Sequence, residues 1–391
     1  IHKITKKTVV IADPGEGIED DKLKYEDKNG RIKTLNLSPY TYIVYNNRPV
    51  AQLPELGKYG TMKVISSDGR GYDVIIVKEY TDYVFGEYRQ SQNLIMMKGT
   101  NTSIKLEDFE DILIYNVDGR SVELTQLVSS DVISVIENED SIEIAVAQNS
   151  KNGTVEVVGN EDGRQYLTLN GVRYELSSEV NNEDAANTDS AALVGSSLTV
   201  YFNIFGRIAG YSLSGNSEHV GYLIWVKYDS DIDIVKAKIF NSIGQFETRG
   251  IRMKGKMIKI DDTQVGYEWF ISENIDSATG KFIPRIVQYK VNSDGEITNI
   301  KGARSAAGEC LYLKSELTQE KRYRAQVRSF SSYAMLKSDA KIFVVPNVEN
   351  SWDNSKYRVV SPTFFTENSR YNGIKFYGTS KRDIAVPYAV Y

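Results

Sequence analysis

The sequence of 391 residues has only one cysteine, Cys310, and two histidines, His2 and His219. A single cysteine excludes an internal disulfide bond and a cysteine-rich metal site, and it does not distinguish the cytosol from an extracellular setting. Two histidines exclude a multi-histidine metal site and an HExxH motif. Several classes of metalloenzyme are therefore excluded.

Long apolar runs are also missing. The longest, such as residues 74–77 and 342–345, fall far below the roughly 20 residues that a membrane-spanning helix needs. The net charge is -5, with acidic and basic residues interspersed, so the chain has no long-range field that attracts nucleic acid or an anionic membrane. We expect no membrane span and no nucleic-acid partner. Because the sequence begins with Ile1 and shows no signal peptide, we also expect a processed protein or a piece of a longer one.

Catalytic signatures are scarce as well. Residues 210–214, GYSLS, lack the last glycine of a GxSxG nucleophile elbow. The glycine pairs at 15–17 and 69–71 lack the third glycine and the following helix of a phosphate-binding loop. Nothing selects a pair of carboxylates for glycoside hydrolysis among the 52 acidic residues. We expect no catalytic residues and no enzyme, and calcium is the one cofactor that the sequence leaves open.

The sequence is rich in features of β-structure. It has 26 tyrosines, and its valines and isoleucines lie in alternating runs, which favours strands. Residues 198–213 are typical: two alternating strands flank Phe205-Gly206, which we interpret as a two-residue hairpin turn. Asn-Gly and Asp-Gly dipeptides, which favour hairpin turns, recur at 29–30, 68–69, 118–119, 152–153, 162–163, 170–171, 294–295 and 372–373.

These patterns predict an all-β protein of several small antiparallel barrel or sandwich domains in tandem, with one short helix at Asp184–Leu193. The linker-like segment 214–218 and the spacing of strands predict domains at 1–90, 91–214 and 215–391. Within the second domain, residues 130–214 suit a small barrel of the OB or SH3 type. The pattern leaves open whether the third is one domain or two, 215–305 and 306–391.

Several hairpins resemble one another in their side chains, such as those at 25–31, 115–120 and 240–245. A separate likeness, to a known family, lies in the segments 69–80, 220–224 with 238–240, 287–297 and 341–346. They resemble the β-rich repeat regions of large S-layer-type surface proteins of Gram-positive bacteria, which accompany S-layer homology modules. The chain has no recognisable module of that kind. The resemblance implies an extracellular structural or adhesive role in a cell-surface assembly. Long alternating strands have exposed edges through which copies can pair, so we expect self-association or binding to other surface proteins.

One acidic segment is a candidate calcium site. Asp229, Asp231 and Asp233 alternate along the chain, so in a strand their carboxylates would point to one side, where they could bind calcium. A solvated turn is the interpretation that we favour. A second acidic cluster, Glu19 to Asp21, has the same two interpretations.

Aromatic pairs such as Tyr40 with Tyr42, or Tyr222 with Trp225, could stack on sugars, although tyrosines in strands more often pack against cross-strand neighbours. Our leading hypothesis is a non-enzymatic extracellular structural protein, or a segment of one, that contributes β domains to a bacterial surface layer, filament or cell-surface assembly. Two alternatives remain: a tail or decoration protein of a phage virion, and a carbohydrate-binding adhesin module with a glycan partner.

Overall fold

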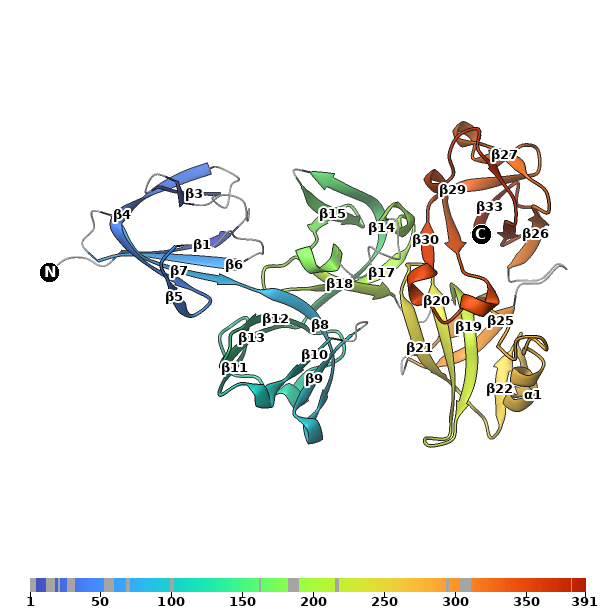
Figure 1. Cartoon of the computed structure of the whole chain (residues 1–391), viewed down its shortest axis with the longest axis horizontal. Helices are drawn as coiled ribbons and strands as arrows, with labels where there is room; N and C mark the ends of the chain where they lie inside the picture. The colour runs from blue at the N-terminus through green and yellow to red at the C-terminus, as the bar shows by residue number, and fades with distance from the viewer. Residues whose placement is uncertain are drawn as a thin grey trace. The chain divides into compact units, whose positions relative to one another are not determined.

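The computed structural model describes residues 5–11, 18–19, 22–26, 32–52, 60–67, 71–98, 102–161, 163–181, 190–214, 218–292, 295–302, 311–380 and 382–391. These residues form five β-sheets, 3-10 turns and one short α-helix, α1 (Tyr267–Ser272) (Figure 1). The prediction of an all-β chain with several sheets in tandem and one short helix is confirmed. No helix in the described part of the chain is long and apolar enough to span a membrane.

The short helix lies elsewhere than predicted. Residues 184–189 of the predicted helix lie outside the described residues, and Ser190–Leu193 form a 3-10 turn, η6. The α-helix instead follows Gly266, where Tyr267 and Phe270 are three residues apart and both turn into the core. That spacing is the signal by which the helix could have been predicted.

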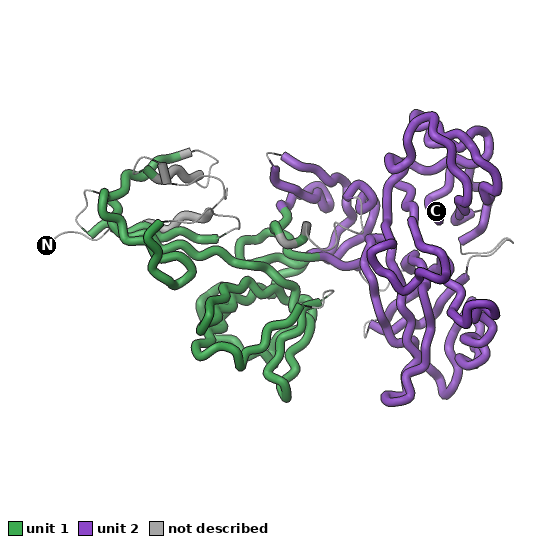
Figure 2. The backbone as a smooth tube through the Cα atoms, viewed as in Figure 1, with its two compact units in different colours: residues 1–150, 176–181, 201–210 green, residues 151–175, 182–200, 211–391 purple. Residues whose placement is uncertain are grey.

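The chain folds into two compact units (Figure 2). Unit 1 comprises residues 1–150, 176–181 and 201–210, and unit 2 comprises residues 151–175, 182–200 and 211–391.

Unit 1 begins with sheet 1, whose strand order is β1-β6-β7-β4-β3-β2, with β5 paired to β4. Its strands are β1 (Thr5–Ile11), β2 (Ile18–Glu19), β3 (Lys22–Glu26), β4 (Ile32–Tyr45), β5 (Arg48–Val50), β6 (Gly60–Ser66) and β7 (Tyr72–Glu79). Alternating apolar residues such as Val64, Ile75 and Val77 form its core.

Sheet 2 follows in unit 1, with the order β10-β9-β8-β12-β13-β11. Its strands are β8 (Thr81–Arg89), β9 (Leu94–Met97), β10 (Ser103–Lys105), β11 (Asp111–Asn116), β12 (Val132–Glu137) and β13 (Ser141–Ala147). Only Tyr80 separates β7 from β8, so one nearly continuous strand passes from sheet 1 into sheet 2 (Figure 1).

Sheet 3 has the order β16-β15-β14-β17-β18. Its strands are β14 (Asn149–Glu161), β15 (Arg164–Leu169), β16 (Val172–Glu175), β17 (Ser197–Phe202) and β18 (Ile208–Leu213). A bridge between Leu176 and Ile208 joins its two ends, as in a small barrel.

Unit 2 also contains sheets 4 and 5. Sheet 4 has the order β21-β20-β19-β24-β25-β22-β23. Its strands are β19 (Glu218–Asp229), β20 (Ile234–Asn241), β21 (Phe246–Ile251), β22 (Met257–Ile260), β23 (Thr263–Gly266), β24 (Arg285–Val291) and β25 (Ile297–Gly302).

Sheet 5 has the order β26-β32-β33-β29-β28-β27-β31, with β30 paired to β29. Its strands are β26 (Tyr312–Glu316), β27 (Lys321–Arg324), β28 (Ser329–Phe330), β29 (Ala334–Val344), β30 (Arg358–Val360), β31 (Arg370–Tyr371), β32 (Lys375–Gly378) and β33 (Ala385–Val390).

The sheet boundaries differ from the predicted domain boundaries at two points. The strand at 81–89 pairs with the strand at 132–137, so sheet 2 crosses the predicted boundary at residue 90. For the same reason residues 132–147 belong to sheet 2, and the sheet that resembles a barrel begins at Asn149 rather than at 130. Long-range strand pairing, which local patterns do not encode, sets both boundaries.

A recurrent loop closes several hairpins. An asparagine opens each loop, and its backbone pairs with the residue four positions later, while the glycine just before that residue has positive φ. In the hairpin at 198–213 the side chain of Asn203 accepts hydrogen bonds from the backbone N–H groups of Phe205 and Arg207, both 2.9 Å long. This loop has three residues between its paired ends, one more than predicted. Among the described residues, loops of this kind occur at 116–120, 203–207 and 241–245, and Asn292, Gly295 and Glu296 show the same pairing and φ.

Candidate functional site

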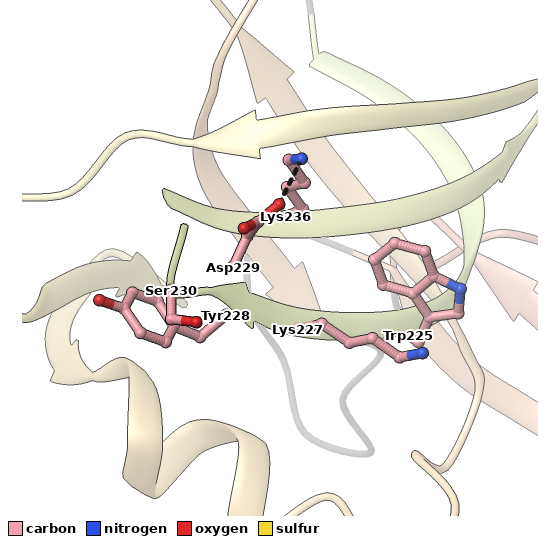
Figure 3. A pocket seen from close by; sticks show the side chains of 6 residues that line it. All are labelled: Trp225, Lys227, Tyr228, Asp229, Ser230 and Lys236. Atoms are coloured by element: carbon pink, nitrogen blue, oxygen red, sulfur yellow. Dashed lines mark hydrogen bonds and ion pairs between the residues drawn. The ribbon is translucent and has the colours of Figure 1, made fainter. Parts of the chain in front are cut away.

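The β19–β20 hairpin of unit 2 carries an open recess of about 310 Å³. Its lining comes from the end of β19, the following turn and β20: Trp225, Lys227, Tyr228, Asp229, Ser230 and Lys236 (Figure 3).

A β-bulge positions these side chains. The register of β19 against β20 shifts between Leu223 and Trp225, which inserts one extra residue into β19. Beyond the bulge, Trp225 lies opposite Lys238 and Lys227 lies opposite Lys236, so these four side chains share one face of the hairpin. Tyr228 belongs to the other face and stacks on Tyr267 of α1, with ring centroids 4.8 Å apart.

The lysines that line the recess outnumber its carboxylates. Lys236 donates a hydrogen bond of 2.8 Å to Asp229, and this bond holds the pKa of the Asp229 carboxyl below its usual value. The ammonium group of Lys227 lies 5.0 Å from the centre of the Trp225 ring. Burial, and then the positive charge of Lys227, lower the pKa of Lys238. Positive charge therefore exceeds negative charge along this face.

The structure places the three calcium candidates around a turn. β19 ends at Asp229 and β20 begins at Ile234, so the strand-like alternation that would gather the carboxylates does not occur, and residues 230–233 form a turn. Asp233 has positive φ and accepts a hydrogen bond of 2.7 Å from the Tyr228 hydroxyl, while Asp229 is paired with Lys236. Among the residues that the structure describes, no group of three or more acidic, histidine or cysteine side chains is arranged to hold a metal ion. Of the second cluster, Asp20 and Asp21 lie outside the described residues.

The two aromatic pairs that could stack on sugars differ in their exposure to solvent. Tyr222 is buried, at 9% exposure, against Tyr357 in an aromatic core shared by sheets 4 and 5, so the pairing of Tyr222 with Trp225 as a sugar platform is wrong. Tyr40 and Tyr42, in β4 of unit 1, are both exposed. Trp225 packs at the edge of the core and lines the recess.

Unit 1 also contains a buried carboxylate, Glu143 of β13, where sheets 1 and 2 meet. Lys78 of β7 contacts both of its oxygens at 2.7 Å, and Asn47, from the β4–β5 turn, donates to it at 3.0 Å. The hydroxyl groups of Tyr115 and Tyr80 also donate to Glu143. Burial alone would raise the pKa of Glu143, but the hydrogen bonds from Lys78, Tyr115 and Asn47 hold it below its usual value. Glu143 therefore stays charged and connects four segments from two sheets.

Asp82 of β8 forms a second buried junction in unit 1. It accepts hydrogen bonds from Ser134 of β12 at 2.6 Å, from Ser177 at 2.8 Å and from the side-chain amide of Asn203 at 2.6 Å. Ser177 and Asn203 come from the two short segments, 176–181 and 201–210, that complete unit 1. Asp82 therefore fixes both segments to sheet 2.

In unit 2, Lys341 of β29 is a buried charged side chain that connects separate segments, as Glu143 and Asp82 do in unit 1. Only 9% exposed, it donates hydrogen bonds to the backbone carbonyl of Ala192 and to the hydroxyl of Ser196, the latter 2.9 Å long. Burial lowers the pKa of Lys341 to about 8, against a smaller opposing effect of Asp339. Lys341 thus connects sheet 5 to the segment that leads into β17.

We expect the free energy of unfolding of unit 2 to rise by about 2 kcal/mol between pH 7.5 and pH 9.5 because of Lys341. Its pKa of about 8 in the folded protein lies below the unfolded value of 10.5, so the unfolded state binds more protons across this range and stability increases with pH. Denaturant titrations followed by tryptophan fluorescence measure this rise. It should vanish in Lys341→Met and persist in Lys337→Met, which removes an exposed lysine of the same strand. An equal rise in Lys341→Met would contradict the assignment of this pH dependence to Lys341.

Sequence reasoning missed Glu143, Asp82 and Lys341. The available signal was a charged residue inside an otherwise apolar strand: Glu143 lies between Ile142 and Ile144, and Lys341 precedes Ile342 and Phe343.

No protein-family model matches the chain, and no curated protein matches it. One similar solved structure is the crystal structure of a multidomain protein with nucleic acid binding domains from Streptococcus pneumoniae TIGR4. The two share 8% sequence identity over 59% of this chain and 74% of that chain, with a TM-score of 0.17. At this TM-score the likeness supports no conclusion about fold or function.

Proposed function

We propose that the chain is a non-enzymatic structural protein that contributes rigid β domains to an extracellular assembly at a bacterial surface. The observation that carries this proposal is the placement of Glu143, Asp82 and Lys341. Each is buried and hydrogen-bonded to groups from separate segments of the chain. Catalytic groups with shifted pKa values instead face a cleft that substrate can enter.

The multiple hydrogen bonds of these groups suit a protein that keeps a fixed shape under mechanical force. A buried charge is costly unless it is fully paired, so the segments that pair with it are held in one geometry. Buried, paired charges therefore fix the orientation of the segments that they connect. The subunits of a lattice or filament need such a fixed geometry.

A short exposed strand edge supports self-association. β11 is the last strand of sheet 2 and pairs with β13 along one side. On its other side, residues 114–116 contact the returning segment 120–122. In the remaining part, Ile112 is 44% exposed and Leu113 is 55% exposed. An edge strand with exposed apolar side chains readily pairs with another strand.

We expect the purified chain to sediment as species larger than a monomer as its concentration rises, and to form a lattice or fibre visible by electron microscopy. Replacing Leu113 with lysine should weaken this association by placing a charge on the exposed edge. The control is Val128→Lys, which alters another exposed apolar residue of unit 1 that lies outside β11. A chain that stays monomeric under all conditions would contradict the proposal, and detection of the protein in phage particles rather than on cells would overturn its surface location.

A further inference from the structure

We propose that the recess on the β19–β20 hairpin binds an acidic glycan, a chain of sugar rings that carry carboxylate groups. The inference is independent of the assembly role and rests on the shape, charge and hydrogen-bonding groups of this site.

The recess lies where a largely covered sheet face becomes exposed. Toward Tyr222 and Phe240 this face of sheet 4 packs against Tyr357 in a shared aromatic core. From Trp225 to Asp229 the same face opens into the recess of about 310 Å³. A volume of this size is at the lower end of those seen for small-molecule sites.

The charge of the recess favours an anion. Lys227 is exposed, and no carboxylate within the described ranges forms an ion pair with it. Lys238, opposite Trp225, donates to the side-chain carbonyl of Asn354 at 2.7 Å, so its charge is not neutralised by that partner. The negative charge of Asp229 is paired with the ammonium group of Lys236. In a chain with a net charge of -5, this face is a local positive site that complements a carboxylate.

The remaining lining groups favour a sugar over a nucleic acid. The Trp225 indole offers an aromatic surface for the apolar face of a sugar ring, and the Asp229 carboxylate and Ser230 hydroxyl can accept hydrogen bonds from sugar hydroxyl groups. A deoxynucleotide chain has no free hydroxyl groups along its length for these two acceptors to bind. A uronic-acid unit provides both the hydroxyl groups and the single carboxylate that this set of side chains suits.

The test is calorimetric titration of the full chain at low salt with three probes of equal length: hexagalacturonate, neutral maltohexaose and hexathymidylate. We expect hexagalacturonate to bind more tightly than the other two. Lys227→Glu should weaken its binding by about tenfold, because an attraction becomes a repulsion. Lys290→Glu makes the same charge change at an exposed position of β24 in the same sheet and should leave binding unchanged.

Three results would overturn the inference. They are the absence of hexagalacturonate binding to the unmodified chain, an equal loss of binding in Lys290→Glu, and tighter binding of hexathymidylate than of hexagalacturonate. Because Lys227 is exposed, the variant is expected to fold, and circular dichroism checks that it does.

Discussion

Replacing Glu143 with alanine is expected to lower the free energy of unfolding of unit 1 by about 3 kcal/mol. The change removes a carboxylate of which 4% is exposed and leaves the ammonium group of Lys78, 28% exposed, without its partner. It also leaves the hydroxyl groups of Tyr115 and Tyr80 without their acceptor. Solvent can reach Lys78, which places the expected loss at the lower end of the range for broken buried pairs.

Tryptophan fluorescence separates this effect from unit 2. All three tryptophans, Trp225, Trp269 and Trp352, lie in unit 2, so their transition should not move in Glu143→Ala. Hydrogen exchange of β7 and β13 should show the loss in unit 1. The matched control is Glu139→Ala, which removes an exposed carboxylate paired with Arg48 and should cost less than about 0.5 kcal/mol. Equal losses in the two variants would contradict the role of Glu143.

The stabilisation by Glu143 should also depend on pH. Its pKa in the folded protein lies below the usual value of 4.5, so the contribution is present above pH 4.5 and is lost as pH falls through the pKa of the folded protein. The difference in stability between the unmodified chain and Glu143→Gln should therefore shrink below pH 4.5.

Replacing Asp82 with alanine is the second large effect, with an expected loss of about 3 kcal/mol in unit 1. The change removes the acceptor of three buried hydrogen bonds, and two of their donors, Ser177 and Asn203, belong to segments that Asp82 holds against sheet 2. We expect faster hydrogen exchange in residues 201–210 and faster proteolysis at 176–181. Asp82→Asn keeps the shape of the side chain and should lose less.

The control for Asp82 is Asp140→Ala, because the Asp140 side chain is 71% exposed and its contact with Arg48 is long, at 3.9 Å. If the exchange rates of residues 201–210 stayed unchanged in Asp82→Ala, the proposed junction would not exist.

Local pattern was sufficient to predict most strands. The pattern of the sequence predicts a strand at 22–26, and β3 has the same bounds. The same pattern predicts two strands, 31–37 and 41–45, whereas the structure has one long strand, β4, from Ile32 to Tyr45. The pairing of β4 with β7 shifts register between Leu37 and Tyr42, so Pro39 lies where regular pairing is interrupted.

The contacts that form the buried junctions could not be predicted from local pattern. A single charge in an alternating strand, such as Glu143, fits the solvent-facing side of a sheet equally well. Its partners Lys78 and Tyr115 lie 65 and 28 residues away in the sequence, and no local spacing indicates that they meet. The bulge after Leu223, which exposes Trp225 and Lys227 together, is likewise set by strand pairing and has no clear sequence signature.

Mechanical unfolding of the full chain, one molecule at a time, tests most directly whether buried charges make consecutive sheets act as one body. If Glu143 couples sheets 1 and 2, the chain from β1 to β13 should extend in one event of roughly 500 Å. In Glu143→Ala the same length should be released in two smaller events. Two separate events in the unmodified chain would contradict the account.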